Sequence, residues 1–147
     1  MEQVIIKCKS VISGLGRLKL VASDESFSFV GGVNIQTGEI TDYRHANYQE
    51  NIKGKAFAFP FGRGSSGAGL VLMEMLRIGT APAALINIHT DPVILTGPLI
   101  CKHFYNQILP VINLRGEDFE KLKGAEEIEL CEDGEHMIVY SGGIERR

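Results

Sequence analysis

The chain has 147 residues, of which 44% are hydrophobic and 22% charged, a composition typical of one ordinary globular domain over residues 1–147. Its formal net charge of −3 offers no excess of Lys and Arg, so we expect neither a nucleic acid nor a membrane as a partner. Because no stretch approaches the roughly 20 apolar residues that a membrane-spanning helix needs, we predict a cytoplasmic protein.

Strand patterns dominate the first sixty residues. We predict strands at residues 4–8, 17–21 and 55–59, and a hairpin turn at Gly14 and Gly16 between the first two. Residues 23–54 contain several turn signals and few apolar runs. A loop of this length inside a compact domain is usually functional.

The character of the chain changes after Pro60. A glycine-serine loop precedes a predicted helix at residues 68–78, which Gly79 ends, and a buried strand at 84–88 follows. Together these segments predict a strand, loop, helix and strand that form a parallel crossover, hence an α/β fold. We further predict strands at 93–96 and 111–114, and a hairpin of 128–130 with 136–140 around Asp133 and Gly134.

The three cysteines are odd in number and far apart in the sequence. Cys8, Cys101 and Cys131 form no CxxC pair and no cluster. This spacing argues against a disulfide framework, and also against a zinc or iron–sulfur site built by this chain alone. We therefore predict no metal ligands in this chain.

The segment GRGSSGAG, which leads into the predicted helix, is the most informative part of the sequence. Glycines let backbone N–H groups converge, and a helix N-terminus attracts anions. The amides of residues 64–67, the hydroxyls of Ser65 and Ser66 and the guanidinium of Arg63 could hold a phosphate or a carboxylate. The same field would stabilise a serine alkoxide as a base. The alternative interpretation is structural, with a serine capping the helix and the glycines making the turn.

A second glycine segment is SFSFVGGVNIQTG, at residues 26–38. Gly31 and Gly32 could bring the backbone close to a ligand or simply turn a strand. The histidines show no metal-binding spacing, so we interpret them as surface or packing residues. The acids lie mostly in turn-like or charged stretches, so we interpret them as solvated. These residues are His45, His89, His103 and His136, and Asp24, Glu25, Asp42, Glu117, Asp118, Glu126 and Glu127.

Three segments together resemble the swivel domain of the aconitase X family, in the same order and at similar spacing: SFVGGVNIQTGEITDYRH, IKGKAFAFPFGRGSS and LMEMLRIGTAPAALI. The resemblance covers most of the chain. It implies a compact swivelling β/β/α domain that closes over the active site of a large catalytic subunit, the two chains together removing water from a small hydroxy acid. It also implies an iron–sulfur cluster in the large subunit and no cofactor bound by this chain.

The resemblance carries specific roles to this sequence. The family's proton-abstracting serine, just after the glycine of GRG, corresponds to Ser65, with the adjacent Ser66 as the alternative. Residues expected at the substrate are Arg63, Gly64, Ser66 and Gly67 in the loop, with Ser28, Gly31 and Gly32 on the neighbouring wall.

The sequence departs from common family patterns at Asn34, in the run SSGAG, and at Pro98 after Gly97. These departures leave two family substrates open, mevalonate 5-phosphate and cis-3-hydroxy-L-proline. The RH of DYRHANYQ and the form GRGSS are closer to the bacterial hydroxyproline pattern, whereas a separate small subunit is compatible with both. A different class of function also stays open, a non-catalytic module that binds an anion and closes over a partner to regulate it.

Overall fold

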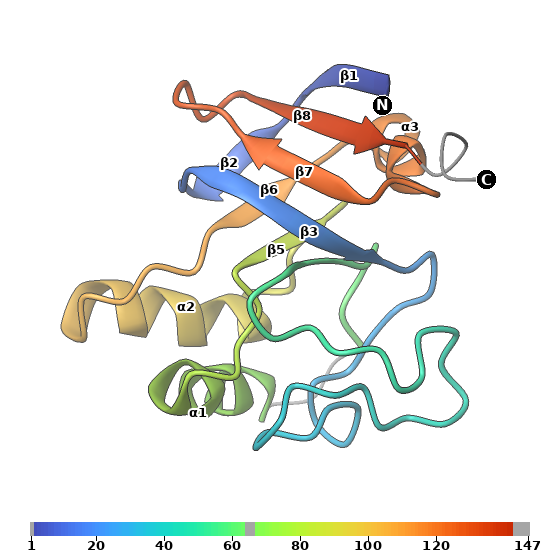
Figure 1. Ribbon diagram of the computed structural model, residues 1–147. Coiled ribbons are helices and arrows are strands. Elements are labelled where there is room, and N and C mark those ends of the chain that lie inside the picture. The colour runs from blue at the N-terminus through green and yellow to red at the C-terminus, as the bar shows by residue number, and fades with distance from the viewer. Residues whose placement is uncertain (1, 64–66, 143–147) are drawn as a thin grey trace.

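The computed structural model describes residues 2–63 and 67–142. Eight strands form one mixed sheet, and two long helices lie against it (Figure 1). In chain order the elements are β1 (Glu2–Lys7), β2 (Lys9–Ile12), β3 (Gly16–Ala22), β4 (Ala56–Ala58), α1 (Ala68–Ile78), β5 (Ala84–Asn87), α2 (Pro92–Phe104), β6 (Val111–Asn113), α3 (Gly116–Phe119), the 3₁₀ helix η1 (Glu120–Leu122), β7 (Glu127–Leu130) and β8 (His136–Ser141).

The sheet has the order β1-β8-β7-β3-β4-β5-β6-β2. Strands β3 to β6 run parallel to one another, and every other neighbouring pair is antiparallel. The edge strands β1 and β2 are consecutive in the chain, separated by Cys8 alone. The sheet must therefore curl until its two edges approach each other at Cys8, which gives the fold a barrel-like half.

The parallel strands are buried on both faces, as strands covered on both sides must be. Phe57, Leu85 and Val111 point to one face, into a core that also contains side chains of α1, α2 and the segment 23–54. Ala58, Ile86 and their neighbours point to the other face, where the antiparallel strands cover them. We call the first the loop-side core and the second the barrel core. Figure 1 shows α1, α2 and the segment 23–54 on the same side of the sheet, away from β1, β7 and β8.

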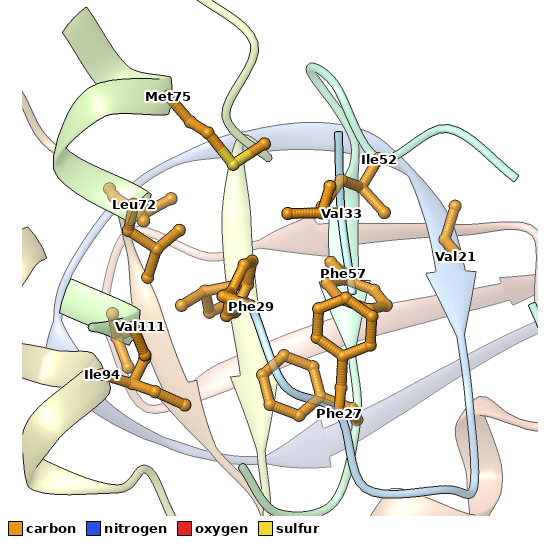
Figure 2. Packing of buried hydrophobic residues seen from close by; sticks show 14 of the residues in the cluster. Val21, Phe27, Phe29, Val33, Ile52, Phe57, Leu72, Met75, Ile94 and Val111 are labelled. Carbon is orange, nitrogen blue, oxygen red and sulfur yellow. The ribbon is translucent and has the colours of Figure 1, made fainter. Parts of the chain in front are cut away.

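Four phenylalanines occupy the centre of the loop-side core (Figure 2). Phe27 packs edge-to-face on Phe29 and Phe57, with ring centroids 5.0 and 4.9 Å apart, and Phe57 lies 4.9 Å from Phe59. Edge-to-face pairs add to the free energy of burial because the ring quadrupoles are complementary. The rings thereby attach the segment around residue 27 to strand β4.

Helices α1 and α2 cross where glycine faces glycine. A Cβ atom at Gly97 would lie 2.3 Å from the carbonyl oxygen of Gly69, and one at Gly69 would lie 2.5 Å from the Thr96 hydroxyl. Only glycine permits this approach of the two backbones. The crossing brings the N-terminal halves of both helices together.

The structure confirms the α/β fold, the parallel crossover from β4 through α1 to β5, the helix at 68–78 and the hairpin at 128–140. Gly79 ends α1 in the left-handed conformation, with φ of 89°.

Two predictions were wrong. The expected hairpin around Gly14 and Gly16 does not form, because β1 pairs over six residues with β8, and β3 pairs with β4 and β7. The strand expected at 93–96 belongs to α2, which Asp91 caps by accepting a hydrogen bond from the Val93 N–H at 2.7 Å, with Pro92 at the first helical position. A cap and a proline at the helix start outweigh the strand preference of the apolar residues that follow.

Candidate functional site

The candidate site lies where strand β4 ends. In parallel sheets, ligands bind beyond the carboxyl ends of the strands. Here the chain leaves β4 and pairs with the segment around Phe27, whose N–H donates to the Phe61 carbonyl at 3.1 Å and whose carbonyl accepts from the Arg63 N–H at 2.9 Å. These bonds place the wall at residues 28–32 directly beside the start of the GRGSS loop.

The glycine pair is required by the wall itself. Gly31 has a φ of +82°, which side chains rarely adopt, and a Cβ atom at Gly32 would lie 2.1 Å from the Ser28 carbonyl oxygen. The Gly32 carbonyl accepts a hydrogen bond from the Thr41 N–H at 3.0 Å. The wall is therefore a tight turn, and its hydrogen bond to Thr41 holds the segment 41–44 beside it.

These segments enclose an open cavity of about 370 Å³. It brings together four of the residues that the sequence predicts at the substrate, Ser28, Gly31, Gly32 and Arg63. The Ser28 hydroxyl donates to the Val30 carbonyl at 3.2 Å, so it also stabilises the turn. The lining residues are Ser28, Val30, Gly31, Gly32, Thr41, Asp42, Tyr43, Arg44 and Arg63.

The predicted residues Gly64, Ser65 and Ser66 lie outside the described residues. The chain on either side of them is described, and both flanks border the same wall. Arg63 lines the cavity, and Gly67 approaches Val30, whose Cγ2 atom would be 3.2 Å from a Cβ atom at Gly67. Gly67 is the N-cap residue of α1.

Three residues of the cavity, Asp42, Tyr43 and Arg44, have no predicted role in the site. The Asp42 carboxylate lies 3.4 Å from a guanidinium nitrogen of Arg63 and accepts a hydrogen bond from the Arg44 N–H at 3.0 Å. That backbone hydrogen bond, with the charges of Arg44 and Arg63, lowers the pKa of Asp42. The signal in the sequence is DYR, an aspartate followed two residues later by the amide that it binds.

His45 is a packing residue, as the sequence predicts. Its ring is 5% exposed and packs edge-on against Phe27, with centroids 5.4 Å apart. Its Nδ1 accepts a hydrogen bond from the Asn47 N–H at 3.1 Å, and its Nε2 lies 3.4 Å from the Ser23 hydroxyl. His45 thus anchors the segment 41–47 to Ser23, which follows the end of β3.

Neither a metal cluster nor a membrane helix is found in the described part of the chain. Within residues 2–63 and 67–142, no three His, Cys, Asp or Glu side chains are placed to hold a metal ion together. In the same ranges no helix has the length and hydrophobicity needed to span a bilayer. The three cysteines are free thiols, and burial raises the pKa of each.

Comparisons with known proteins place this geometry in context. The family model described as "Aconitase X swivel domain" matches residues 5–139. The phosphomevalonate dehydratase small subunit of Methanothermobacter thermautotrophicus is 32% identical over 129 residues, which cover 87% of this chain and 94% of that protein. The cis-3-hydroxy-L-proline dehydratase of Hypocrea jecorina is 33% identical over 119 residues, 81% of this chain but 20% of that longer protein.

Among solved structures, the crystal structure of Thermococcus kodakaraensis aconitase X in its holo-form matches with a TM-score of 0.81 and 25% identity. The match covers 94% of this chain and 99% of that one. A solution NMR structure of a UPF0107 protein, 24% identical with a TM-score of 0.76, shows the same fold. The curled mixed sheet with its two helices is thus shared over nearly the full length of both chains.

Proposed function

The chain belongs to the aconitase X swivel domain family, and from this membership we propose that it is the small subunit of a two-chain dehydratase acting on a small hydroxy acid. The observation that carries the proposal is the cavity beside the GRGSS loop. Its walls contain the glycine pair and Arg63, both expected at the substrate. The match to a dehydratase small subunit, over 87% of this chain and 94% of that protein, supports a separate large subunit as the partner.

We assign the proton-abstracting step to Ser65. Of the residues that flank 64–66 in the sequence, Arg63 lines the cavity and Gly67 approaches Val30 of the wall, which supports a role for this loop at the substrate. In the proposed step the Ser65 alkoxide takes a proton from a substrate carbon, and the electrons of that C–H bond form the new double bond. The hydroxyl on the adjacent carbon leaves with the electrons of its C–O bond, so the proton on Ser65 and the released hydroxide together account for the water that is lost. Loop amides and Arg63 would hold an oxyanion of the substrate meanwhile.

The iron–sulfur cluster belongs, in this proposal, to the large subunit. The described residues of this chain offer no ligand set for it. The steps at the metal therefore lie with the partner, and this chain binds the substrate, excludes water and moves the proton.

The substrate that we place first is mevalonate 5-phosphate. Relatives of similar length, which are separate small subunits, carry the name phosphomevalonate dehydratase. The alternative is cis-3-hydroxy-L-proline, because the fungal dehydratase of that name is as similar in sequence, at 33% identity. Both molecules present an oxyanion to Arg63.

A non-catalytic anion-binding module is the second candidate function. The observation that favours it is that Asp42, the one carboxylate lining the described part of the cavity, is ion-paired with arginines and unsuited to act as a base.

Reconstitution separates these functions. The chain should be inactive alone, and mixing it with its large subunit, with the cluster assembled, should produce dehydration of mevalonate 5-phosphate. A complex that dehydrates only cis-3-hydroxy-L-proline would replace the substrate and keep the reaction class. The proposal would be overturned if the two chains form a stable complex but the large subunit alone turns over either substrate as well as the complex does. That result would favour a regulatory module.

A further inference from the structure

One carboxylate joins two arginines at the rim of the cavity. The Asp42 side chain is 14% exposed, and each of its oxygens faces a different guanidinium. Oδ2 lies 3.4 Å from Nη2 of Arg63, and Oδ1 lies 3.5 Å from Nε of Arg44. The pair of arginines comes from two segments far apart in the sequence, the 41–44 turn and the start of the GRGSS loop.

Hydrogen bonds also hold the backbone at both arginines. The Arg63 N–H donates to the Phe27 carbonyl at 2.9 Å, and the Arg44 N–H donates to Asp42 Oδ1 at 3.0 Å. His45, next to Arg44, is buried and bonded to Asn47. The two guanidiniums therefore extend from rigid supports, which lowers the entropy lost when they bind a ligand.

The charges favour an anion in the cavity. Two guanidiniums alone would repel each other, but the Asp42 carboxylate between them lets them converge. The group of three retains one net positive charge. A guanidinium has five N–H donors, and the contacts with Asp42 are made by Nη2 of Arg63 and Nε of Arg44. The Arg63 and Arg44 side chains remain 52% and 77% exposed, so further donors are open to a ligand.

We propose that Arg44 and Arg63 together bind one oxyanion of the substrate, a carboxylate or a phosphate, and that Asp42 is the positioning residue that holds the two guanidiniums at this spacing. The inference rests on the proposed function, because it identifies the ligand as the hydroxy acid. It adds Arg44 and Asp42 to the site, neither of which the sequence pattern or the family comparison assigns.

Steady-state kinetics of the reconstituted complex test the two arginines. Replacing Arg44→Gln should raise the KM by about tenfold to a hundredfold, the value of a lost charge-assisted hydrogen bond, with a much smaller change in kcat. The matched control is Arg77→Gln, which removes an equally exposed arginine paired with Glu74 on α1. An unchanged KM in Arg44→Gln, or an equal rise in both variants, would overturn the role of Arg44.

Anion binding by the full chain alone tests the two arginines and does not depend on turnover. The Nε–H resonances of Arg44 and Arg63 would be followed by NMR during titration with inorganic phosphate and, separately, with acetate. We expect the resonances of both arginines to shift with at least one anion. The anion that binds with the lower Kd, phosphate or acetate, identifies the kind of oxyanion that the site prefers. A response from neither arginine to either anion would overturn the site, even if the complex is an active dehydratase.

The variant Asp42→Asn gives the decisive comparison. Asparagine keeps the oxygen that accepts the Arg44 N–H but removes the charge that attracts both guanidiniums. If Asp42 positions the arginines, the same anion should bind at least about fivefold more weakly, a change of roughly 1 kcal/mol. If Asp42 only reduces the positive charge of the cavity, the variant should bind the anion more tightly, and that result would overturn the positioning role.

Discussion

The two faces of the parallel strands β4, β5 and β6 are both buried, yet they are built differently. The barrel core holds mostly alanines and aliphatic side chains, with Phe119 and Met137, and its strands pair in continuous register from β5 to β6 and from β7 to β8. The loop-side core holds four phenylalanines, and much of its cover is the irregular segment 23–54. Regular strand pairing makes one face a stable support, and the other face carries turns that can place functional groups beside the ends of the strands.

This comparison predicts that the two faces respond differently to substitution. The largest loss of stability should follow Ile86→Ala, because Ile86 is fully buried at the centre of the barrel core. We expect the free energy of unfolding to fall by about 2 to 5 kcal/mol, measured by urea denaturation. The control Ile5→Ala, at a side chain 68% exposed on β1, should change it by less than about 0.5 kcal/mol.

The comparison also predicts that the folded fraction of the Ile86→Ala protein keeps the kcat of the wild type in the reconstituted complex. Equal losses of stability from the two isoleucine variants would contradict the contribution of Ile86 packing in the barrel core to the stability of the fold.

A smaller effect is expected at Cys8, where the two edges of the sheet meet. Burial, with the nearby charges of Asp133, Cys131 and Glu135, raises the pKa of the Cys8 thiol to about 11. An unfolded thiol ionises near pH 9, so between pH 9 and 11 the unfolded state binds fewer protons than the folded state, and stability falls as the pH rises.

Replacing Cys8→Ala should therefore reduce the loss of unfolding free energy between pH 8 and pH 11 by about 2 kcal/mol. Urea denaturation at the two pH values measures this difference for each protein. Parallel pH profiles for the variant and the wild type would show that Cys8 ionises as freely in the folded chain as in the unfolded one.

The sequence was sufficient to predict the helices and turns that depend on neighbouring residues. Helix α1 ends at a glycine in the left-handed conformation, and the hairpin of β7 and β8 turns at Asp133 and Gly134, both readable from neighbouring residues. The partners of β1 and β3 were not readable, because pairing across more than a hundred residues depends on closure of the sheet. In α2, an aspartate followed by proline was the local signal that the apolar run VILT obscured.

The site was predictable in part for the same reason. The glycine wall and Arg63 stand out as motifs, and the structure brings them to one cavity. Asp42 and Arg44 lie in a polar stretch that looks like ordinary solvated surface. Their proximity to Arg63 arises only when residues 27 and 62 pair across the intervening loop.

The most direct test of the central claim, that the loop beside this cavity performs the proton transfer, is the kcat of the reconstituted complex with Ser65→Ala. We expect kcat to fall by about a thousandfold or more, since a positioned base contributes roughly 10² to 10⁴ in rate, while complex assembly is retained. Ser66→Ala, the matched neighbouring variant, should lose far less. Unchanged turnover in Ser65→Ala, or a comparable loss confined to Ser66→Ala, would contradict the assignment of Ser65 as the base.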